Sequence, residues 1–203
     1  MSAGVSIYVP SEPGALRQGE ILTGLVQVKL AVGSLFPIGD EQRILEEVIH
    51  PFVIVASQDC DLDWDYKARK SISSKGEIEV GADKMMPNII FCEANTASAL
   101  KSSPGINSEI WKRVRQNKDE RYQFLEQVSP EQDSLKEGVA ELGVDFKRYF
   151  TIPTAEVYAR LEKNEFKRRC RLDHPYLQHF MTRYGNFQSR VALPAEHQSE
   201  PQI

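Results

Sequence analysis

The stretch His50-Pro51-Phe52-Val53-Ile54-Val55-Ala56-Ser57 determines the fold class. Residues 52–56 are apolar without interruption, and a strand that is apolar on both faces lies deep in a sheet. The segment 19–30 predicts a second strand, because its side chains alternate in character. Gln27 and Lys29 lie on one face of that strand, and Val26, Val28 and Leu30 lie on the other.

On either side of these two strands, strand and helix patterns alternate along the chain. Further strands are predicted at 88–94, 121–126 and 144–153, and apolar residues at helical spacing predict a helix over 106–116. Two later helices are expected. One begins at Thr154 as its N-cap, and the other covers about 174–184, with Asp173 as N-cap and Pro175 as its first helical residue. Residues 57–65 indicate a polar loop, and 67–84 an exposed, charged one. The predicted class is α+β.

One domain is expected for a chain of 203 residues. The proposed division of residues 1–203 places a β-rich core with a helical insertion at 18–153 and a helical C-terminal segment at 154–194. Residues 1–17 and 195–203 are polar or rich in proline and are expected to be flexible.

Composition excludes several classes of protein. With 41% hydrophobic and 27% charged residues, the chain is neither a coiled coil nor collagen-like nor wholly disordered. It has no apolar run of membrane-spanning length and no signal-peptide pattern, so we expect a cytoplasmic protein without a membrane partner. Three widely spaced cysteines indicate neither a disulfide framework nor a zinc site, and no cofactor is expected. The net charge of −4 argues against a globally basic nucleic-acid binder.

An acidic run, Asp59-Cys60-Asp61-Leu62-Asp63-Trp64-Asp65, follows the buried strand. In an extended chain its four carboxylates would share one face, as in a magnesium or calcium site. An EF-hand loop is excluded, because Trp64 stands where its glycine belongs and Lys70 where its bidentate acid belongs. The alternative is a solvated turn whose carboxylates bind backbone amides, and no metal ligand is assigned. Cys60 is expected to face the core as a structural residue. The candidate polar site comprises Gln58, Asp59, Asp61 and Asp63.

Ser57 and His50 are the catalytic candidates. Ser57 follows the C-terminal end of the buried strand, and His50 precedes the strand. If the fold brings them together, they can support nucleophilic or acid–base catalysis. The alternative is a serine that caps a turn and a histidine at the surface.

The C-terminal region is locally basic. Residues 146–190 carry ten Lys or Arg and four Asp or Glu, and aromatic residues lie between them. This pattern is typical of surfaces that contact phosphates and stack bases, whereas the alternative is a solvated segment beside core aromatics. The candidate nucleic-acid-binding residues are Lys147, Arg148, Arg168, Arg169, Arg171, Arg183 and Arg190.

Two of these segments, Gly19-Glu20-Ile21 and the stretch from His50 to Ser57, resemble the PemK/MazF-like toxin family. The resemblance implies a small SH3-like antiparallel β-barrel, here with inserted and C-terminal helices, and metal-independent RNA cleavage. Ser57 would take the family's Ser/Thr position, and His50 would replace its arginine. That replacement removes a permanent cation from the scissile phosphate.

A second resemblance adds a family without adding a function. It is to a group of uncharacterised bacterial proteins, and it is carried by Ser57-Gln58-Asp59-Cys60-Asp61-Leu62, Arg121-Tyr122, Val144-Asp145-Phe146 and residues 190–194.

Three functions follow as hypotheses. The first is an RNA-interacting protein, either a metal-independent endoribonuclease or a non-catalytic relative. The second is a non-catalytic protein-interaction module of a bacterial defence or regulatory system, marked by an exposed apolar patch around Trp64 and Tyr66. The third is a metal-dependent phosphodiesterase that uses the Asp59–Asp63 carboxylates with Glu93 or His174.

Overall fold

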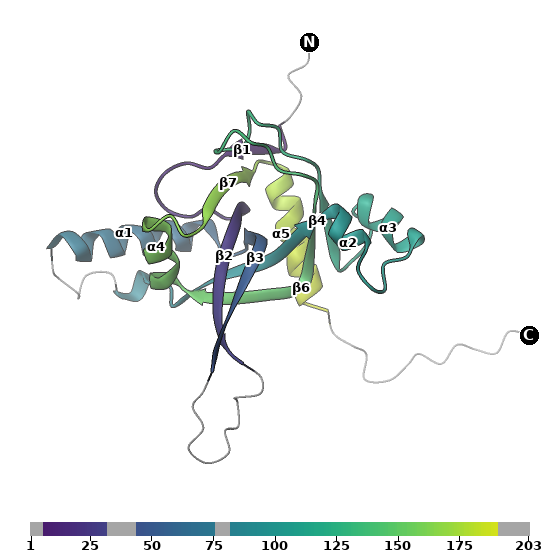
Figure 1. Ribbon diagram of the computed structural model, residues 1–203. Coiled ribbons are helices and arrows are strands. Elements are labelled where there is room, and N and C mark those ends of the chain that lie inside the picture. Colours follow the sequence, from purple (N-terminus) through teal and green to yellow (C-terminus); the bar gives the residue numbers. More distant parts are fainter. Residues whose placement is uncertain (1–5, 32–43, 76–81, 191–203) are drawn as a thin grey trace, which may run out of the picture.

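The computed structural model of the protein describes residues 6–31, 44–75 and 82–190 (Figure 1). This part of the chain is α+β, with a seven-stranded antiparallel sheet in the order β1-β7-β2-β3-β4-β6-β5 and five α-helices. The strands are β1 (Tyr8–Pro10), β2 (Glu20–Leu30), β3 (Leu45–Val55), β4 (Asn88–Thr96), β5 (Tyr122–Leu125), β6 (Leu142–Pro153) and β7 (Lys167–Leu172). The helices are α1 (Asp59–Lys75), α2 (Ala97–Lys101), α3 (Ser108–Arg115), α4 (Thr154–Glu162) and α5 (Tyr176–Gln188), with a short 3₁₀ helix η2 (Ala82–Lys84).

Both faces of the sheet are covered. On one face, apolar side chains from all seven strands pack around Phe180 of α5, which is fully buried. On the other face, Leu62 of α1 and Val157 of α4 lie in a second core. A smaller third core joins α2 and α3 to β5. The central strands β2, β3 and β4 are therefore buried on both faces where the helices cover them, as the apolar stretch 52–56 predicted.

The sheet is open, whereas the family resemblance implied a closed barrel. Strands β1 and β5 are its edges, and side chains occupy the groups that closure would need. The Tyr8 hydroxyl donates to the Glu126 carbonyl at 2.7 Å. On β5, the Asn117 side chain accepts from the Phe124 N–H and donates to the Phe124 carbonyl. Since these groups are already bonded, β5 cannot pair with a further strand there.

The first position of the Gly-Glu-Ile segment, Gly19, requires glycine for two reasons. Its φ of +76° lies in the left-handed region, and a Cβ there would come within 2.6 Å of the Leu177 side chain. Gly19 also donates its N–H to the Val55 carbonyl, which fixes the start of β2 against the end of β3. The close approach of Leu177 to Gly19 places α5 directly against the sheet.

The prediction of a polar loop over 57–65 is wrong, because α1 begins at Asp59. The inward positions of this helix include Asp65 and Arg69 beside Leu62, and the Arg69 guanidinium donates to the Asp65 carboxylate at 2.8 Å. Because charged residues occupy these inward positions, the sequence lacks the apolar stripe from which a helix is usually predicted. Of the expected loop 67–84, residues 67–75 are helical, 82–84 form η2, and 76–81 lie outside the described residues.

The structure also corrects the ends of the chain. Within the segment 154–194, expected to be helical, β7 is a strand that pairs with both β1 and β2. In the lead-in expected to be flexible, residues 8–10 form β1, and Leu16 is fully buried. The tail 195–203 and residues 1–5 lie outside the described residues.

The strands and helices predicted at 19–30, 88–94, 106–116, 121–126 and 144–153 are confirmed within a few residues, and the strand 52–56 extends back to Leu45. The expected caps differ. Thr154 is the first residue of α4 and Pro153 its N-cap, while α5 has Pro175 as its N-cap. No helix in the described residues combines the length and the apolar character that crossing a membrane requires.

Candidate functional site

The structure does not bring Ser57 and His50 together. His50 lies within β3 and Ser57 follows the end of that strand, which rises by about 3.3 Å per residue, so the five steps from His50 to Val55 alone separate them by roughly 16 Å. The Ser57 hydroxyl is buried and accepts the N–H of Ile90 at 2.9 Å. It therefore holds the end of β3 to β4. A mechanism in which His50 activates Ser57 has no geometric support.

The acidic run does not form one face. In a helix, residues two apart point about 200° from each other and residues four apart share a face, so Asp59 and Asp63 lie on one side of α1, and Asp61 and Asp65 on the other. Asp59 accepts from the Arg17 guanidinium and from the Gln18 N–H, Asp63 pairs with Lys67, and Asp65 is buried against Arg69. Among the described residues, no three His, Cys, Asp or Glu side chains converge on a point that would hold a metal ion.

Around this run, Cys60 and Gln58 are exposed, and Asp61 is partly exposed. The prediction that Cys60 faces the core is wrong, because the helix turns it outward. The other expected partners of a metal site do not join the run: Glu93 bonds His50, and the ring of His174 contacts Gln178.

The segments that carry the toxin-family resemblance meet at one end of the sheet. Gln18 and Gly19 bond the chain at Val55, Ala56 and Asp59. Beside them, Glu20 is fully buried and accepts two hydrogen bonds from Arg168, at 2.5 and 2.9 Å. The same arginine donates to the carbonyls of Gly14 and Ala15. This end of the sheet is thus a packed structural corner.

His50 belongs to a separate polar cluster. Its ring stacks on Phe150 at a centroid distance of 4.1 Å, its Nδ1 lies 3.6 Å from Glu93 Oε2, and its Nε2 lies 3.3 Å from Gln27 Oε1. The side chain of His50 is only 6% exposed. Hydrogen bonding with His50, supported by Asn95 and Arg148 against the opposing effect of burial, lowers the pKa of Glu93 to about 2.

A bulge in β6 supplies the rest of this cluster. Cys92 pairs with Tyr149 but Ala94 pairs with Val144, so the register shifts and four residues of β6, 145–148, stand opposite Glu93 alone. Arg148 then donates to Glu93 at 3.0 Å, and Arg121 donates to Asp145 through two nitrogens, at 2.8 and 2.6 Å. The cluster alternates acid and base, with Arg148 exposed at its rim.

Three of the seven expected nucleic-acid-binding residues are committed to the interior. Arg168 holds Glu20, as described above. Arg169 is buried and pairs with Asp133 at 3.0 and 2.7 Å. Arg183 donates to the side chains of Gln123 and Asn117 and to the carbonyls of Asp119 and Tyr122. These guanidinium groups hold the segment before β2, the connection between β5 and β6, and the start of β5.

The other four basic candidates lie at the surface in different places. Lys147 and Arg148 lie on the bulge of β6, while Arg171 is partly exposed on β7. Arg190 follows α5, where it covers the Phe187 ring and pairs with Glu120. They do not form one continuous basic surface.

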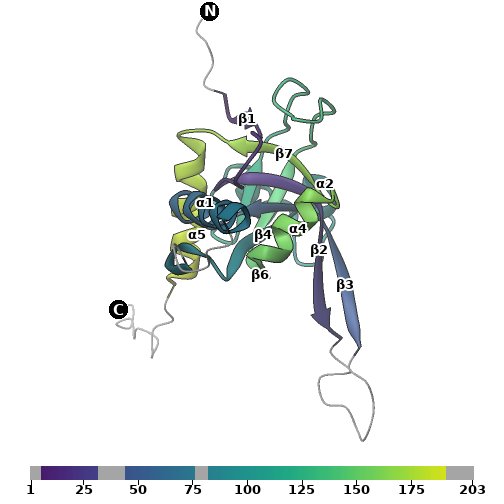
Figure 2. The ribbon, with the colours of Figure 1, turned by 90° about the vertical axis from the view of Figure 1, so that its left-hand side faces the viewer.

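The most exposed apolar surface lies on a two-stranded projection, which we call the arm: residues 26–30 of β2 and 45–49 of β3. The arm extends away from the body of the protein (Figure 2). Directly opposed residues share a face, so the register Val26↔Ile49, Val28↔Glu47 and Leu30↔Leu45 defines one face. Apart from Glu47 that face is apolar, and Leu45 and Ile49 are 67% and 68% exposed. The opposite face carries Gln27, Lys29, Glu46 and Val48.

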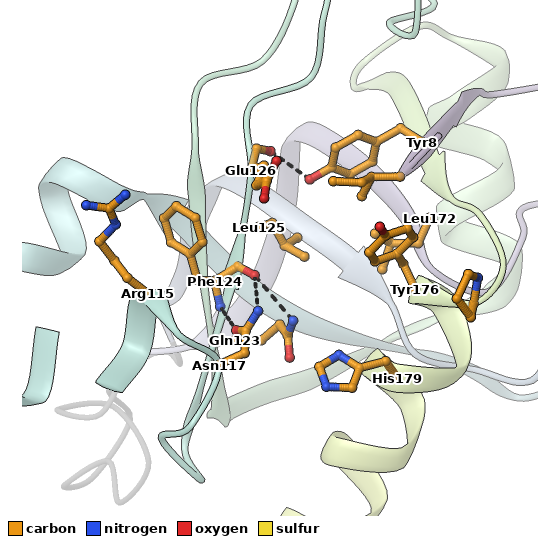
Figure 3. Close-up of a pocket in the computed structure, with 12 residues that line it drawn as sticks. Tyr8, Arg115, Asn117, Gln123, Phe124, Leu125, Glu126, Leu172, Tyr176 and His179 are labelled. Carbon is orange, nitrogen blue, oxygen red and sulfur yellow. Dashed lines mark hydrogen bonds between the residues drawn. The ribbon is translucent and has the colours of Figure 1, made fainter. Parts of the chain in front are cut away.

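A pocket of about 410 Å³ marks the open seam of the sheet, between β5 on one side and β1, β7 and α5 on the other (Figure 3). Its floor includes Leu125 and Leu172. The Asn117 and Gln123 side chains within it are bonded to the Phe124 backbone. Those two amides therefore serve the fold.

Comparison with known proteins finds no matching family model and no matching curated protein.

Sequence reasoning missed the arm surface and most of the His50 cluster. Asp145 and Arg121 appeared only as parts of a resemblance, although an acid and a base on predicted neighbouring strands were a usable signal. The two-faced pattern of 26–30 was recognised, but its exposure depends on where β4 and β7 stop pairing, which no local pattern encodes.

Proposed function

We propose that the protein is a non-catalytic protein-interaction module that binds a partner protein on the apolar face of its arm. The observation that carries this proposal is the exposure of Leu45 and Ile49 beside Val28 and Leu30, on a projection that extends away from the body of the protein (Figure 2). Soluble proteins rarely present a contiguous apolar surface of this kind unless it is a binding site.

The energetics favour a binding role. Full burial of a Val, Leu or Ile side chain stabilises by about 1.5–3 kcal/mol, and the arm holds several that are exposed. A two-stranded ribbon alone is only marginally stable in water. A partner that covers this face would therefore gain affinity and also order the arm.

The expected patch around Trp64 and Tyr66 is a weaker candidate. Trp64 is 54% exposed on α1. The Tyr66 ring, however, packs on the Tyr158 ring at a centroid distance of 5.4 Å and lies beneath the Lys70 ammonium group. The two aromatic side chains thus do not form one open surface.

The test uses the full chain with Ile49→Lys and, as matched control, Trp64→Lys. A partner isolated with the wild-type chain is purified and its affinity measured. We expect Ile49→Lys to weaken binding at least tenfold, which is about 1.4 kcal/mol, and Trp64→Lys to leave it unchanged. Equal loss in both variants would contradict the arm as the site. A concentration-dependent dimer that Ile49→Lys dissociates would also overturn the proposal, because a second copy would then occupy the face.

A second candidate function is contact with RNA, and the exposed cations of the β6 bulge favour it. Arg148 and Lys147 lie at the surface there, and Arg121 is partly exposed. The test is incubation with end-labelled single-stranded RNA in EDTA, beside Ser57→Ala, His50→Ala and Arg148→Ala. The separation of Ser57 from His50 leads us to expect a gel shift without cleavage. Cleavage that both Ser57→Ala and His50→Ala abolish would establish a ribonuclease instead.

A further inference from the structure

The edge of β3 along the arm is uncovered in the described part of the chain. Strand β4 pairs with β3 only from Phe52 to Val55. Beyond Ala94, the last residues of β4, Asn95 and Thr96, pair only with β6, at Gly143 and Leu142. Residues 45–49 therefore pair with β2 alone, and their outer backbone groups face the space that β4 leaves. An uncovered edge is a template for another strand.

We infer that the partner binds by adding an extended segment to this edge of β3. The inference depends on the proposed function, because it specifies how the arm is recognised. A strand added here continues the sheet in the place that β4 vacates, and main-chain hydrogen bonds supply affinity while alternate side chains supply specificity.

The charges on β3 distinguish its uncovered edge from the edge of β2 in the arm. Strand β3 carries Glu46 and Glu47, whereas β2 carries Lys29 directly opposite Glu46. Glu47 instead lies opposite Val28, in the middle of the apolar face. No ion pair joins it to another described residue. A basic side chain from the added strand would neutralise this carboxylate as it is desolvated.

The alternation of β3 then defines the segment that fits. Leu45, Glu47 and Ile49 lie on one face, two residues apart. Side chains of an added strand that lie beside them must share that face. The matching sequence is therefore apolar–any–basic–any–apolar, with the Lys or Arg beside Glu47.

The experiment selects from a library of random 16-residue peptides displayed on phage, using the wild-type chain as bait and Ile49→Lys for counter-selection. Selected peptides are synthesised with Lys or Glu at the central position. For the Lys peptides we expect Glu47→Lys to weaken binding at least tenfold, and for the Glu peptides to strengthen it by a similar factor. Glu109→Lys on α3 is the matched control and should change neither.

The outcomes separate the two proposals. If no peptide depends on Ile49, the arm is not a docking face and both proposals fail. If Ile49-dependent peptides show apolar residues at i, i+3 and i+4, or are indifferent to the charge at residue 47, the arm binds partners but not by strand addition. An alternating pattern with a central basic residue, whose charge preference Glu47→Lys reverses, supports the inference.

Discussion

His50 and Glu93 face each other across β3 and β4, with Nδ1 of the ring 3.6 Å from Oε2 of the carboxylate. Ser57, expected to act with this histidine, instead bonds the backbone of Ile90 beyond the far end of the strand. His50 therefore has an acidic partner, and Ser57 is not beside it. We therefore expect the pairing of His50 with Glu93 to stabilise the fold.

The carboxylate of Glu93 should make the protein sensitive to acid. Its pKa is lowered to about 2 in the folded state, against about 4.3 for an unperturbed Glu. A lowered pKa contributes stability above the unfolded value, and this contribution is lost as the pH falls from about 4.3 to 2. Glu93→Gln should therefore be less stable than wild type at pH 6, and the difference in melting temperature should shrink below pH 4. A difference that is constant from pH 6 to 2.5 would contradict the ionised role of Glu93.

Gly19 and Gly24 provide a matched pair that separates backbone strain from packing. The φ angles of Gly19 and Gly24 are +76° and +77°. A Cβ on Gly19 would come within 2.6 Å of the Leu177 side chain, whereas a Cβ on Gly24 would meet nothing within 4 Å. Gly24→Ala should cost only the left-handed conformation, about 1–2 kcal/mol. Gly19→Ala should cost a further 1–3 kcal/mol or so for overpacking. Urea denaturation of both variants measures the difference, and equal losses would show that α5 adjusts without cost.

Asp133 organises the connection between β5 and β6. It is fully buried and accepts from Arg169 and from the N–H groups of Leu135, Glu137 and Gly138. Although burial raises its pKa, the hydrogen bonds from Arg169 and from the backbone lower the pKa overall. Breaking a buried pair by removing one partner costs about 3–5 kcal/mol, and we expect this loss in the unfolding free energy of Asp133→Ala.

The control for that measurement is Glu137→Ala. This carboxylate lies 3.3 Å from the same guanidinium but is 66% exposed, so its removal should cost no more than about 1 kcal/mol. A large loss in Glu137→Ala with a small loss in Asp133→Ala would reverse the assignment.

Much of the fold could be predicted because it is encoded locally. The alternation in β2 and the apolar stretch of β3 indicated their strands directly. That the sheet stays open could not be predicted, since it depends on the side chains of Tyr8 and Asn117 meeting the backbone near β5. Helix α1 was hidden by the inward pair Asp65–Arg69, whose charges imitate an exposed loop.

The candidate sites were harder to predict because they also depend on contacts between residues that are far apart in the sequence. Arg168, Arg169 and Arg183 are indistinguishable in sequence from surface cations, and only the fold reveals their internal acceptors. The apolar face of the arm was visible as a pattern. Its exposure results from the point at which β4 stops pairing with β3, at Phe52 and Ala94.

The arm, which we propose as the binding site, should be dispensable for stability. Ile49 is 68% exposed and lies beyond the last β3–β4 pair at Phe52, so Ile49→Lys removes little buried surface. Surface substitutions of this kind usually change stability by no more than about 0.5 kcal/mol. We therefore expect the urea midpoint of Ile49→Lys to match wild type, while Phe52→Lys, which changes the terminal β3–β4 pair and a side chain packed against the core, lowers it strongly. If Ile49→Lys unfolds the protein as Phe52→Lys does, the arm packs on the body, and its apolar face is not available to a partner.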